Sequence, residues 1–293
     1  MAEPGFTGAG LDRADHLRLD EQELAVLRLH AEARLLSLAE LDPVLDDSGA
    51  LAWSALAGED EGTIFLGLED GAPRFAPLIR TTALGQRAWG VFRLLASMSP
   101  KDAAIWAAAR SLNEWHNRHV YCGVCGTETR SFRAGWGRLC PKCGMEHFPR
   151  VDPVVIMLAE HGDRVLVARG PGYPPRRYSA LSGFVEPAES IEEAVARELM
   201  EEAGIAVSDV RYVASQPWPF PGSLMIACLA RAGSDTLTLD TNELEDAIWV
   251  DRAGVEAALA AEPDAPFQAP PPFAIANTLL TRWIEADIEG GRR

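Results

Sequence analysis

The stretch GFVEPAESIEEAVARELMEEAGI, residues 183–205, contains the most sharply bounded helix that the sequence predicts. Ser190 and Glu193 have the spacing of a capping box, in which each side chain bonds to a backbone N–H of the other residue. Gly204 supplies a residue that adopts the left-handed conformation with which many helices end. We therefore predict a helix from about residue 191 to residue 203.

Three glutamates of this helix fall on one side of it. At 3.6 residues per turn, Glu198, Glu201 and Glu202 lie within about 100° of one another, next to the apolar sector that would pack on a sheet. Like charges at this spacing cost about 0.2–0.5 kcal/mol per pair, and acidic groups in a last turn oppose the helix dipole. A solvated charged face is the usual explanation for such a run, but Arg197 is the only neutralising neighbour. Convergent carboxylates favour a hard divalent cation instead.

Segments around this helix predict a mixed sheet. VVIML (154–158) and RVLVAR (164–169) flank a turn at 161–163, and LMIACLAR (224–231) and AIWVDR (247–252) follow the helix. A Pro-rich connection at 260–272 precedes a last helix at about 273–288. Strands on both sides of a helix indicate an α+β protein, with a mixed-sheet α/β/α domain over residues 151–293.

Two Cys-x-x-Cys pairs lie upstream, Cys122 with Cys125 and Cys140 with Cys143. Four cysteines at this spacing are typical of a small structural zinc ribbon, here residues 118–150, with disulfides as the weaker alternative. His116 and His119 are interpreted as structural, because four cysteines complete the ligand shell, and Cys228 as a core residue. The ribbon carries six basic and two acidic residues, so a nucleic-acid-binding ribbon stays open as a second interpretation.

Residues 1–117 predict a mixed α/β domain. A helix is expected near residues 20–32, and Asp70-Gly71 is typical of a hairpin turn. Ser99 and Pro100 are suited to open a long helix that runs into the first cysteine pair.

The composition limits the function classes. The 293 residues carry a formal net charge of −16, which disfavours broad binding of polyanions outside the basic ribbon. No apolar run has the length of a membrane span, and the first ten residues do not resemble a signal peptide. We therefore expect no membrane association and a cytoplasmic location.

The strip SQPWPFPGS, residues 215–223, has three prolines, two large aromatics and no charge. A surface turn is the simple interpretation. Alternating prolines exclude an ordinary central strand, and stiff aromatic faces favour a preformed platform for flat rings. The platform would use Trp218 and Phe220 for stacking, and Gln216 and Ser223 for orientation.

The acidic helix resembles the Nudix box: Gly183, five residues, Glu189, seven residues, Arg197-Glu198-Leu199, one residue, Glu201-Glu202, one residue, Gly204-Ile205. The resemblance implies a hydrolase of nucleoside diphosphates linked to another moiety, dependent on Mg²⁺ or Mn²⁺. It assigns Glu198, Glu201 and Glu202 to the metal ions. Arg197 and Glu189 are implied as partners that orient the loop and the helix.

The strip and the ribbon resemble the NADH pyrophosphatase subgroup of this family. This resemblance implies that the strip residues bind substrate, namely Gln216, Pro217, Trp218, Pro219, Phe220, Pro221, Gly222 and Ser223. By position it adds Glu243 and the carbonyl of Ser182 as metal ligands, and Phe148, Ala276 and Arg93 as nucleotide contacts. The alternative interpretation of Arg93 is an ordinary surface arginine. The alternative interpretation of Glu243 is an isolated surface glutamate.

The resulting hypothesis is hydrolysis of the pyrophosphate bond of NAD(H), giving AMP and nicotinamide mononucleotide, by a homodimer with one structural zinc ion per chain. Glu202 is expected to be the most sensitive residue. One alternative is removal of NAD caps from RNA, with Arg130, Arg133, Arg138 and Lys142 guiding the strand. The other is an inert nucleotide-binding Nudix module.

Overall fold

The computed structural model describes residues 4–56, 62–82 and 89–290. It divides into two compact units. One contains residues 152–217 and 223–290 with residues 4–5, and the other contains residues 6–151 with Trp218–Gly222. None of the helices in these ranges combines the length and the apolar character that crossing a membrane requires.

The C-terminal unit is built on a six-stranded mixed sheet. Its main path runs β13-β14-β10-β11-β15, with β12 paired to β10. The β10–β14 pair is parallel, and the pairs of β10 with β11 and β12 are antiparallel. Its strands are β10 (Asp152–His161), β11 (Arg164–Arg169), β12 (Leu181–Phe184), β13 (Val207–Trp218), β14 (Ser223–Ala232) and β15 (Asp246–Asp251).

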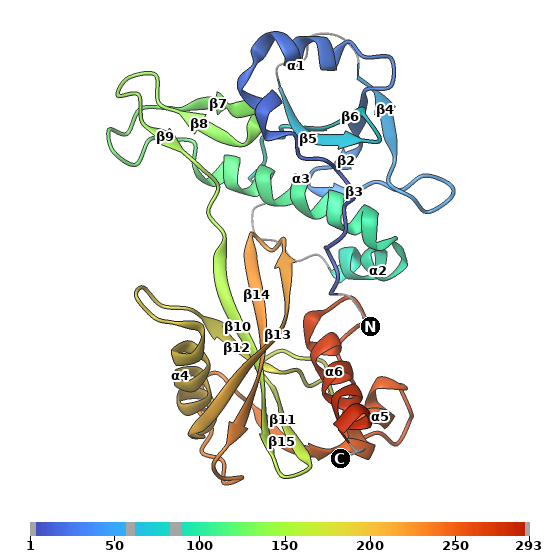
Figure 1. Ribbon diagram of the computed structural model, residues 1–293, viewed down its shortest axis with the longest axis vertical. Coiled ribbons are helices and arrows are strands. Elements are labelled where there is room, and N and C mark those ends of the chain that lie inside the picture. Colours follow the sequence, from blue (N-terminus) through green and yellow to red (C-terminus); the bar gives the residue numbers. More distant parts are fainter. Residues whose placement is uncertain (1–3, 57–61, 83–88, 291–293) are drawn as a thin grey trace. The chain divides into compact units, whose positions relative to one another are not determined.

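Helices cover both faces of this sheet, as Figure 1 shows. On one face, α4 (Ile191–Ala203) buries Val195 and Leu199 against strand residues that include Met157 and Cys228. On the other face, α5 (Arg252–Leu259) and α6 (Ile275–Gly290) enclose a second apolar layer. The predicted α/β/α arrangement is thus confirmed, and Cys228 is a fully buried core residue.

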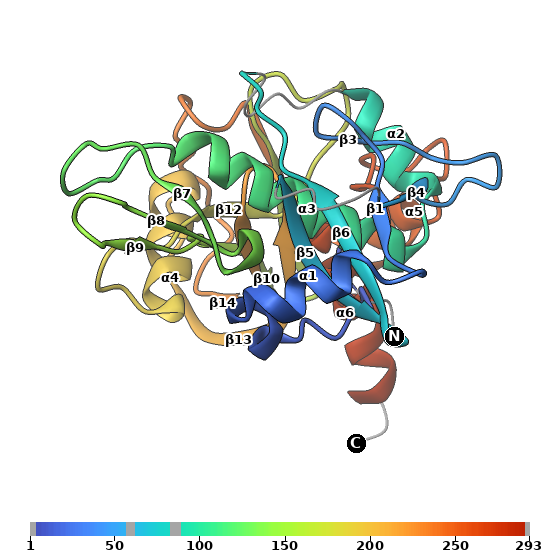
Figure 2. The same ribbon diagram turned by 90° about the horizontal axis from the view of Figure 1, so that it is seen from above.

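The other unit combines a four-stranded sheet with helices. The sheet has the order β4-β1-β6-β5, and α1 and α3 lie on opposite sides of it (Figures 1 and 2). The expected hairpin turn at Asp70-Gly71 joins β5 to β6, and Ser99 caps α3 through the backbone N–H of Asp102. Its elements before the ribbon are η1 (Asp15–Leu19), α1 (Glu21–Arg28), β1 (Arg34–Leu36), β2 (Leu38–Ala39), β3 (Asp42–Pro43), β4 (Trp53–Ala55), β5 (Thr63–Glu69), β6 (Ala72–Pro77), α2 (Trp89–Ser97) and α3 (Pro100–Arg118).

The cysteine ribbon follows α3 in the same unit. It contains β7 (Arg130–Phe132), η2 (Arg133–Gly135), β8 (Gly137–Leu139) and β9 (Glu146–His147). The four sulfurs lie within 4.8 Å of one another, with Sγ···Sγ distances of 3.7 Å for Cys122–Cys143 and 3.5 Å for Cys125–Cys140. A tetrahedron with Zn–S bonds of about 2.3 Å has edges of about 3.8 Å. The sulfurs are therefore spaced for a closed, structural zinc site.

A buried polar network ties the ribbon to α3. The side chain of Arg138 is 2 % exposed and donates to both oxygens of Thr129, each at 2.6 Å. His116 bonds to Arg138 through Nδ1 and to the Gly135 carbonyl through Nε2, and burial lowers the pKa of His116 to about 4. The structural interpretation of His116 is confirmed. The prediction that Arg138 guides RNA is wrong, because its guanidinium is buried and bonded to Thr129 and His116.

Candidate metal-dependent active site

The helix α4 begins and ends where its caps predict. Ser190 accepts from the Glu193 N–H, Glu193 accepts from the Ser190 N–H, and Gly204 adopts φ 71° at the C-terminus. Strand β12 runs beside this helix and brings Gly183 against Glu198. A Cβ atom at residue 183 would lie 1.9 Å from the Glu198 carboxyl carbon, so only glycine leaves room for that carboxylate.

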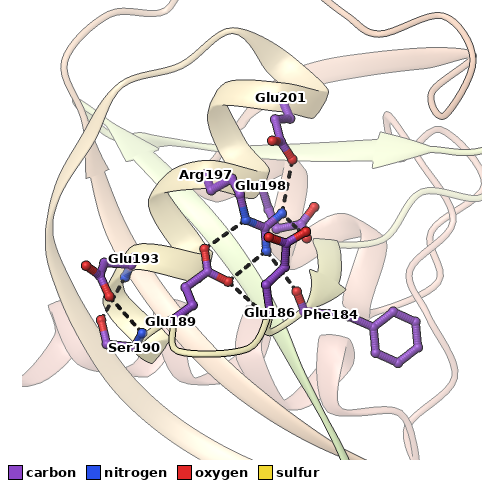
Figure 3. Close-up of polar contacts among 8 residues, drawn as sticks. All are labelled: Phe184, Glu186, Glu189, Ser190, Glu193, Arg197, Glu198 and Glu201. Atoms are coloured by element: carbon purple, nitrogen blue, oxygen red, sulfur yellow. Dashed lines mark hydrogen bonds and ion pairs between the residues drawn. The ribbon is translucent and has the colours of Figure 1, made fainter.

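Arg197 organises the entrance to the helix (Figure 3). Its Nε and Nη2 donate to the two oxygens of Glu189 at 2.8 and 2.9 Å, and Nη2 also donates to the Phe184 carbonyl. Its Nη1 contacts Glu198 at 2.7 Å and Glu201 at 3.0 Å. These bonds raise the pKa of Arg197 and lower that of Glu189. Arg197 therefore holds loop, strand and helix together through one guanidinium.

Glu202 is the most perturbed carboxyl of the group. It is 5 % exposed, and no hydrogen bond or ion pair reaches its carboxylate from the residues that the structure describes. Burial raises the pKa of Glu202 to about 8, and the charges of Glu198, Glu243 and Glu201 add to the shift. Burial also raises the pKa of Glu198, against the opposing effect of Arg197.

Glu243 comes to this group from the loop between β14 and β15. It is exposed, and its charge contributes to the raised pKa of both Glu198 and Glu202. The loop reaches the end of α4 because Thr238 N–H donates to the Ala203 carbonyl and Asp240 N–H to the Glu202 carbonyl. The backbone of this loop therefore lies at the last turn of α4, which carries Glu201 and Glu202.

This donor set suits a hard divalent cation. It offers carboxylate oxygens only, and Glu202 is a buried carboxyl that carries a charge most easily when a cation is bound. Among the described residues, however, the four cysteines are the only group of three or more potential ligands gathered within 4.8 Å. Two of the glutamates, Glu198 and Glu201, instead share the Nη1 donor of Arg197.

Residues 215–223 connect the two units, and their ends belong to the unit that contains the glutamates. The amide of Gln216 is fully buried and bonds to backbone only: Nε2 donates to the carbonyls of Gly5 and Phe273, and Oε1 accepts from the Ile275 N–H. This differs from the expected contact with substrate. Gln216 instead fixes the start of α6, and Ser223 is buried at 8 % exposure.

The middle of the strip, Trp218–Gly222, belongs to the other unit. Phe220 is 6 % exposed and packs against Phe92, Trp106 and Trp218, with ring centroids 5.3–6.0 Å apart. Phe220 thus serves as an anchor of the strip and not as an open stacking face. Trp218 is half-buried and keeps part of its surface accessible.

A buried arginine that sequence reasoning missed holds this anchor. Arg110 on α3 donates from Nε to the Pro219 carbonyl at 3.1 Å, and its guanidinium lies 4.9 Å from the Phe220 ring centroid. It also contacts Glu114 and Asp42 at 3.4 Å. No sequence motif marks Arg110, because its partners lie 4 to 109 positions away.

The other predicted site residues are dispersed. Ser182 lies on β12 opposite Ile156, and Ala276 is buried on α6. Phe148 is 38 % exposed beyond β9, and Arg93 is exposed on α2. Sequence reasoning also passed over Phe184, next to Gly183, whose ring is 62 % exposed and points away from Arg197 (Figure 3).

Comparisons with known proteins match both parts of this description. Residues 148–270 match the NUDIX domain family, and residues 117–148 match the NADH pyrophosphatase zinc ribbon domain. The NAD-capped RNA hydrolase NudC of Mycobacterium bovis is 35 % identical, over 97 % of this chain and 96 % of its own length.

Two human proteins match a shorter part. The NAD-capped RNA hydrolase NUDT12 is 44 % identical over 65 % of this chain, and the mitochondrial NAD(P)H pyrophosphatase NUDT13 is 38 % identical over 66 %. The matched region spans 43 % of the length of NUDT12 and 58 % of the length of NUDT13.

Proposed function

Because the chain belongs to the Nudix hydrolase family, in the NudC-like subgroup with the NADH pyrophosphatase zinc ribbon, we propose that it hydrolyses the pyrophosphate bond of NAD(H). The observation that carries the proposal is the buried carboxyl of Glu202, which no described residue reaches with a hydrogen bond or ion pair. It lies one helical turn from Glu198, whose carboxylate fills the space left by Gly183. The products would be AMP and the nicotinamide mononucleotide.

The residues around α4 would have separate roles in the reaction. Glu198, Glu201, Glu202 and Glu243 would hold Mg²⁺ or Mn²⁺, with the Ser182 carbonyl as a further oxygen ligand. Such an ion would neutralise the charge of the substrate diphosphate and lower the pKa of a bound water molecule. Arg197 and Glu189 keep the loop and the helix in register. The water oxygen would bond to one phosphorus while a glutamate of the motif accepts the proton of the water. The bond from that phosphorus to the bridging oxygen would break, and the bridging oxygen would leave with the other mononucleotide.

Aromatic and polar residues would select the dinucleotide. Phe184 and the accessible part of Trp218 offer faces for flat rings, each worth about 1–3 kcal/mol. Phe148, Ala276 and Arg93 stay proposed nucleotide contacts, and Pro217, Pro219, Pro221 and Gly222 are proposed to stiffen and shape the strip. We propose that Gln216, Ser223 and Phe220 support the strip from within.

A second substrate is supported by the names of two relatives, which are NAD-capped RNA hydrolases. The same bond is broken when NAD forms the 5′ cap of an RNA. Arg130 and Lys142 are exposed and would contact the strand, whereas Arg133 is engaged by Asp15 at 2.9 Å. We also propose a homodimer and one structural zinc ion per chain, held by the four cysteines.

The test is product analysis by mass spectrometry after incubation with Mg²⁺ or Mn²⁺. Wild type and Glu202→Gln should be compared on NADH, NAD⁺ and NAD-capped RNA. We expect AMP and the reduced mononucleotide from NADH with wild type, and turnover at least about 100-fold lower with Glu202→Gln, as is typical when a charge-stabilising group is removed.

Two outcomes would contradict the proposal. If wild type binds NADH without converting it, the chain is a nucleotide-binding Nudix module. If Glu202→Gln retains full activity, the chemistry lies elsewhere. Cleavage of capped RNA alone would restrict the substrate to the RNA cap.

A further inference from the structure

We propose that Asp240 is a positioning residue that sets the place of Glu243 relative to Glu202, and with it the affinity of the site for a divalent cation. The inference rests on the proposed function, because it assumes that these glutamates share a cation. Asp240 lies in the loop between β14 and β15 and is half-buried.

The first half of the argument is the contact with α4. The last carbonyls of a helix have no intrahelical donor and need other partners. Here Asp240 N–H donates to the Glu202 carbonyl at 3.0 Å, next to the bond from Thr238 N–H to the Ala203 carbonyl at 2.9 Å. Asp240 is thus fixed to the backbone of the residue whose carboxyl is most deeply buried in the site.

The second half is the turn that carries Glu243. The Asp240 Oδ1 accepts from the backbone N–H of Asn242 at 2.9 Å and from its side-chain Nδ2 at 2.7 Å. The Asp240 carbonyl accepts from Glu243 N–H at 3.1 Å and Leu244 N–H at 2.9 Å. An aspartate that bonds two residues ahead stabilises a local turn, so a single residue joins the helix end to this turn.

Glu243 has little else to determine its position. Its carboxylate is exposed and makes no hydrogen bond or ion pair with any residue in the described ranges. Its backbone bond to Asp240 fixes one side of the turn, and Glu245 N–H bonds to the Arg169 carbonyl on the other. A weaker turn would let Glu243 move away from Glu202 without disturbing the sheet or α4.

A direct ligand role for Asp240 is the competing explanation, and it makes a different prediction. Asparagine keeps an acceptor oxygen for the turn and removes the negative charge. A positioning residue therefore tolerates Asp240→Asn and not Asp240→Ala, whereas a metal ligand tolerates neither.

The experiment measures Mn²⁺ binding to the full chain by electron paramagnetic resonance, alongside kcat for NADH. We expect Asp240→Ala to weaken Mn²⁺ binding about tenfold, a loss typical of removing an outer-shell partner of a metal ligand, and to lower kcat. Asp240→Asn should stay within about twofold of wild type on this scale. Ser234→Ala is the control in the same loop, because it removes the bond from Thr236 N–H to Ser234 Oγ and should change neither quantity.

A double-mutant cycle separates positioning from general destabilisation. Once Glu243→Gln has removed the carboxylate, adding Asp240→Ala should weaken binding no further. If Asp240→Ala does not fold, Asp240→Ser, which keeps a weaker acceptor, takes its place in the cycle.

Three results would overturn the inference: wild-type Mn²⁺ affinity in Asp240→Ala, equal losses in Asp240→Asn and Asp240→Ala, or additive losses in the cycle. Failure of the proposed function is a separate result. In that case wild type does not hydrolyse NADH, while the Mn²⁺ affinities can still be compared.

Discussion

Glu202 combines burial with a group of like charges, which makes its ionisation costly in the folded state. Its pKa is raised from 4.5 to about 8. Between these values the folded protein holds a proton that the unfolded chain has lost, so the free energy of unfolding decreases as pH rises. The slope approaches about 1.4 kcal/mol per pH unit and gives a few kcal/mol in total.

We therefore predict that Glu202→Gln is more stable than wild type without added divalent cations, and that the difference grows from pH 5 to pH 8. Glutamine stays neutral throughout this range. Urea unfolding at several pH values measures the difference, and added Mn²⁺ should stabilise wild type more than the variant. If the free energy of unfolding depends on pH in the same way in both proteins, Glu202 ionises as freely in the folded chain as in the unfolded one. That outcome would contradict the prediction.

Several side chains could not be placed from the sequence, for a common reason. Arg138, Gln216 and Arg110 each find partners that are distant along the chain, at separations of up to 22, 211 and 109 residues. Charge and amide content alone suggested solvent or ligand contacts for Arg138 and Gln216. Only the fold supplies the carbonyls and rings that bury them.

At the scale of elements, local signals were sufficient. The capping box and Gly204 bound α4 as expected, and both predicted hairpins, at Asp70-Gly71 and at residues 161–163, are present. These signals work because cap and turn bonds join residues two to four positions apart. The meeting of β12 with α4 is different, because no local rule says that Gly183 faces Glu198.

That meeting leads to a prediction for Gly183→Ala. The backbone of Gly183 is not in the left-handed region, so the added methyl acts through its contact with the Glu198 carboxylate. A flexible carboxylate can move, and we expect the protein to fold with a thermal midpoint lowered by a few degrees, equivalent to about 1 kcal/mol. Mn²⁺ affinity and kcat should fall by about tenfold or more, as when the support of a ligand is lost.

Gly90→Ala is the matched control, since a Cβ there meets no atom of a described residue within 4 Å and alanine favours a helix. Isothermal titration with Mn²⁺ and calorimetric melting measure both variants. Unchanged metal affinity in Gly183→Ala would separate this glycine from the cation site and leave it a packing role only.

At the scale of the whole molecule, the chain leaves the unit that contains the glutamates after Pro217 and returns to it at Ser223. The residues between are held in the other unit by Arg110 and by aromatic packing. The sequence predicted a stiff, aromatic strip, and two of its aromatic side chains, Trp218 and Phe220, pack against each other. It did not predict which unit would hold the strip, because proline and aromatic content determine stiffness and not the packing partner.

A substitution of Arg110 therefore alters the support of the strip and leaves the glutamates unchanged. Arg110→Lys keeps the buried positive charge beside Glu114, but it loses the planar group that bonds to Pro219 and packs on Phe220. If the strip contributes to nucleotide binding as proposed, KM for NADH should rise several-fold, with Mn²⁺ affinity unchanged. An effect confined to KM corresponds to binding shared by ground state and transition state.

Arg118→Lys is the control, because Arg118 contacts the same Glu114 at 3.3 Å but is 41 % exposed. Steady-state kinetics on NADH, with thermal melting of both variants, compares them. Equal KM values in the two variants would mean that anchoring the strip matters for folding alone. A larger KM in Arg110→Lys than in Arg118→Lys, at matched stability, would link Arg110 to substrate recognition. The effect would pass through the strip, whose middle residues belong to the same unit as Arg110.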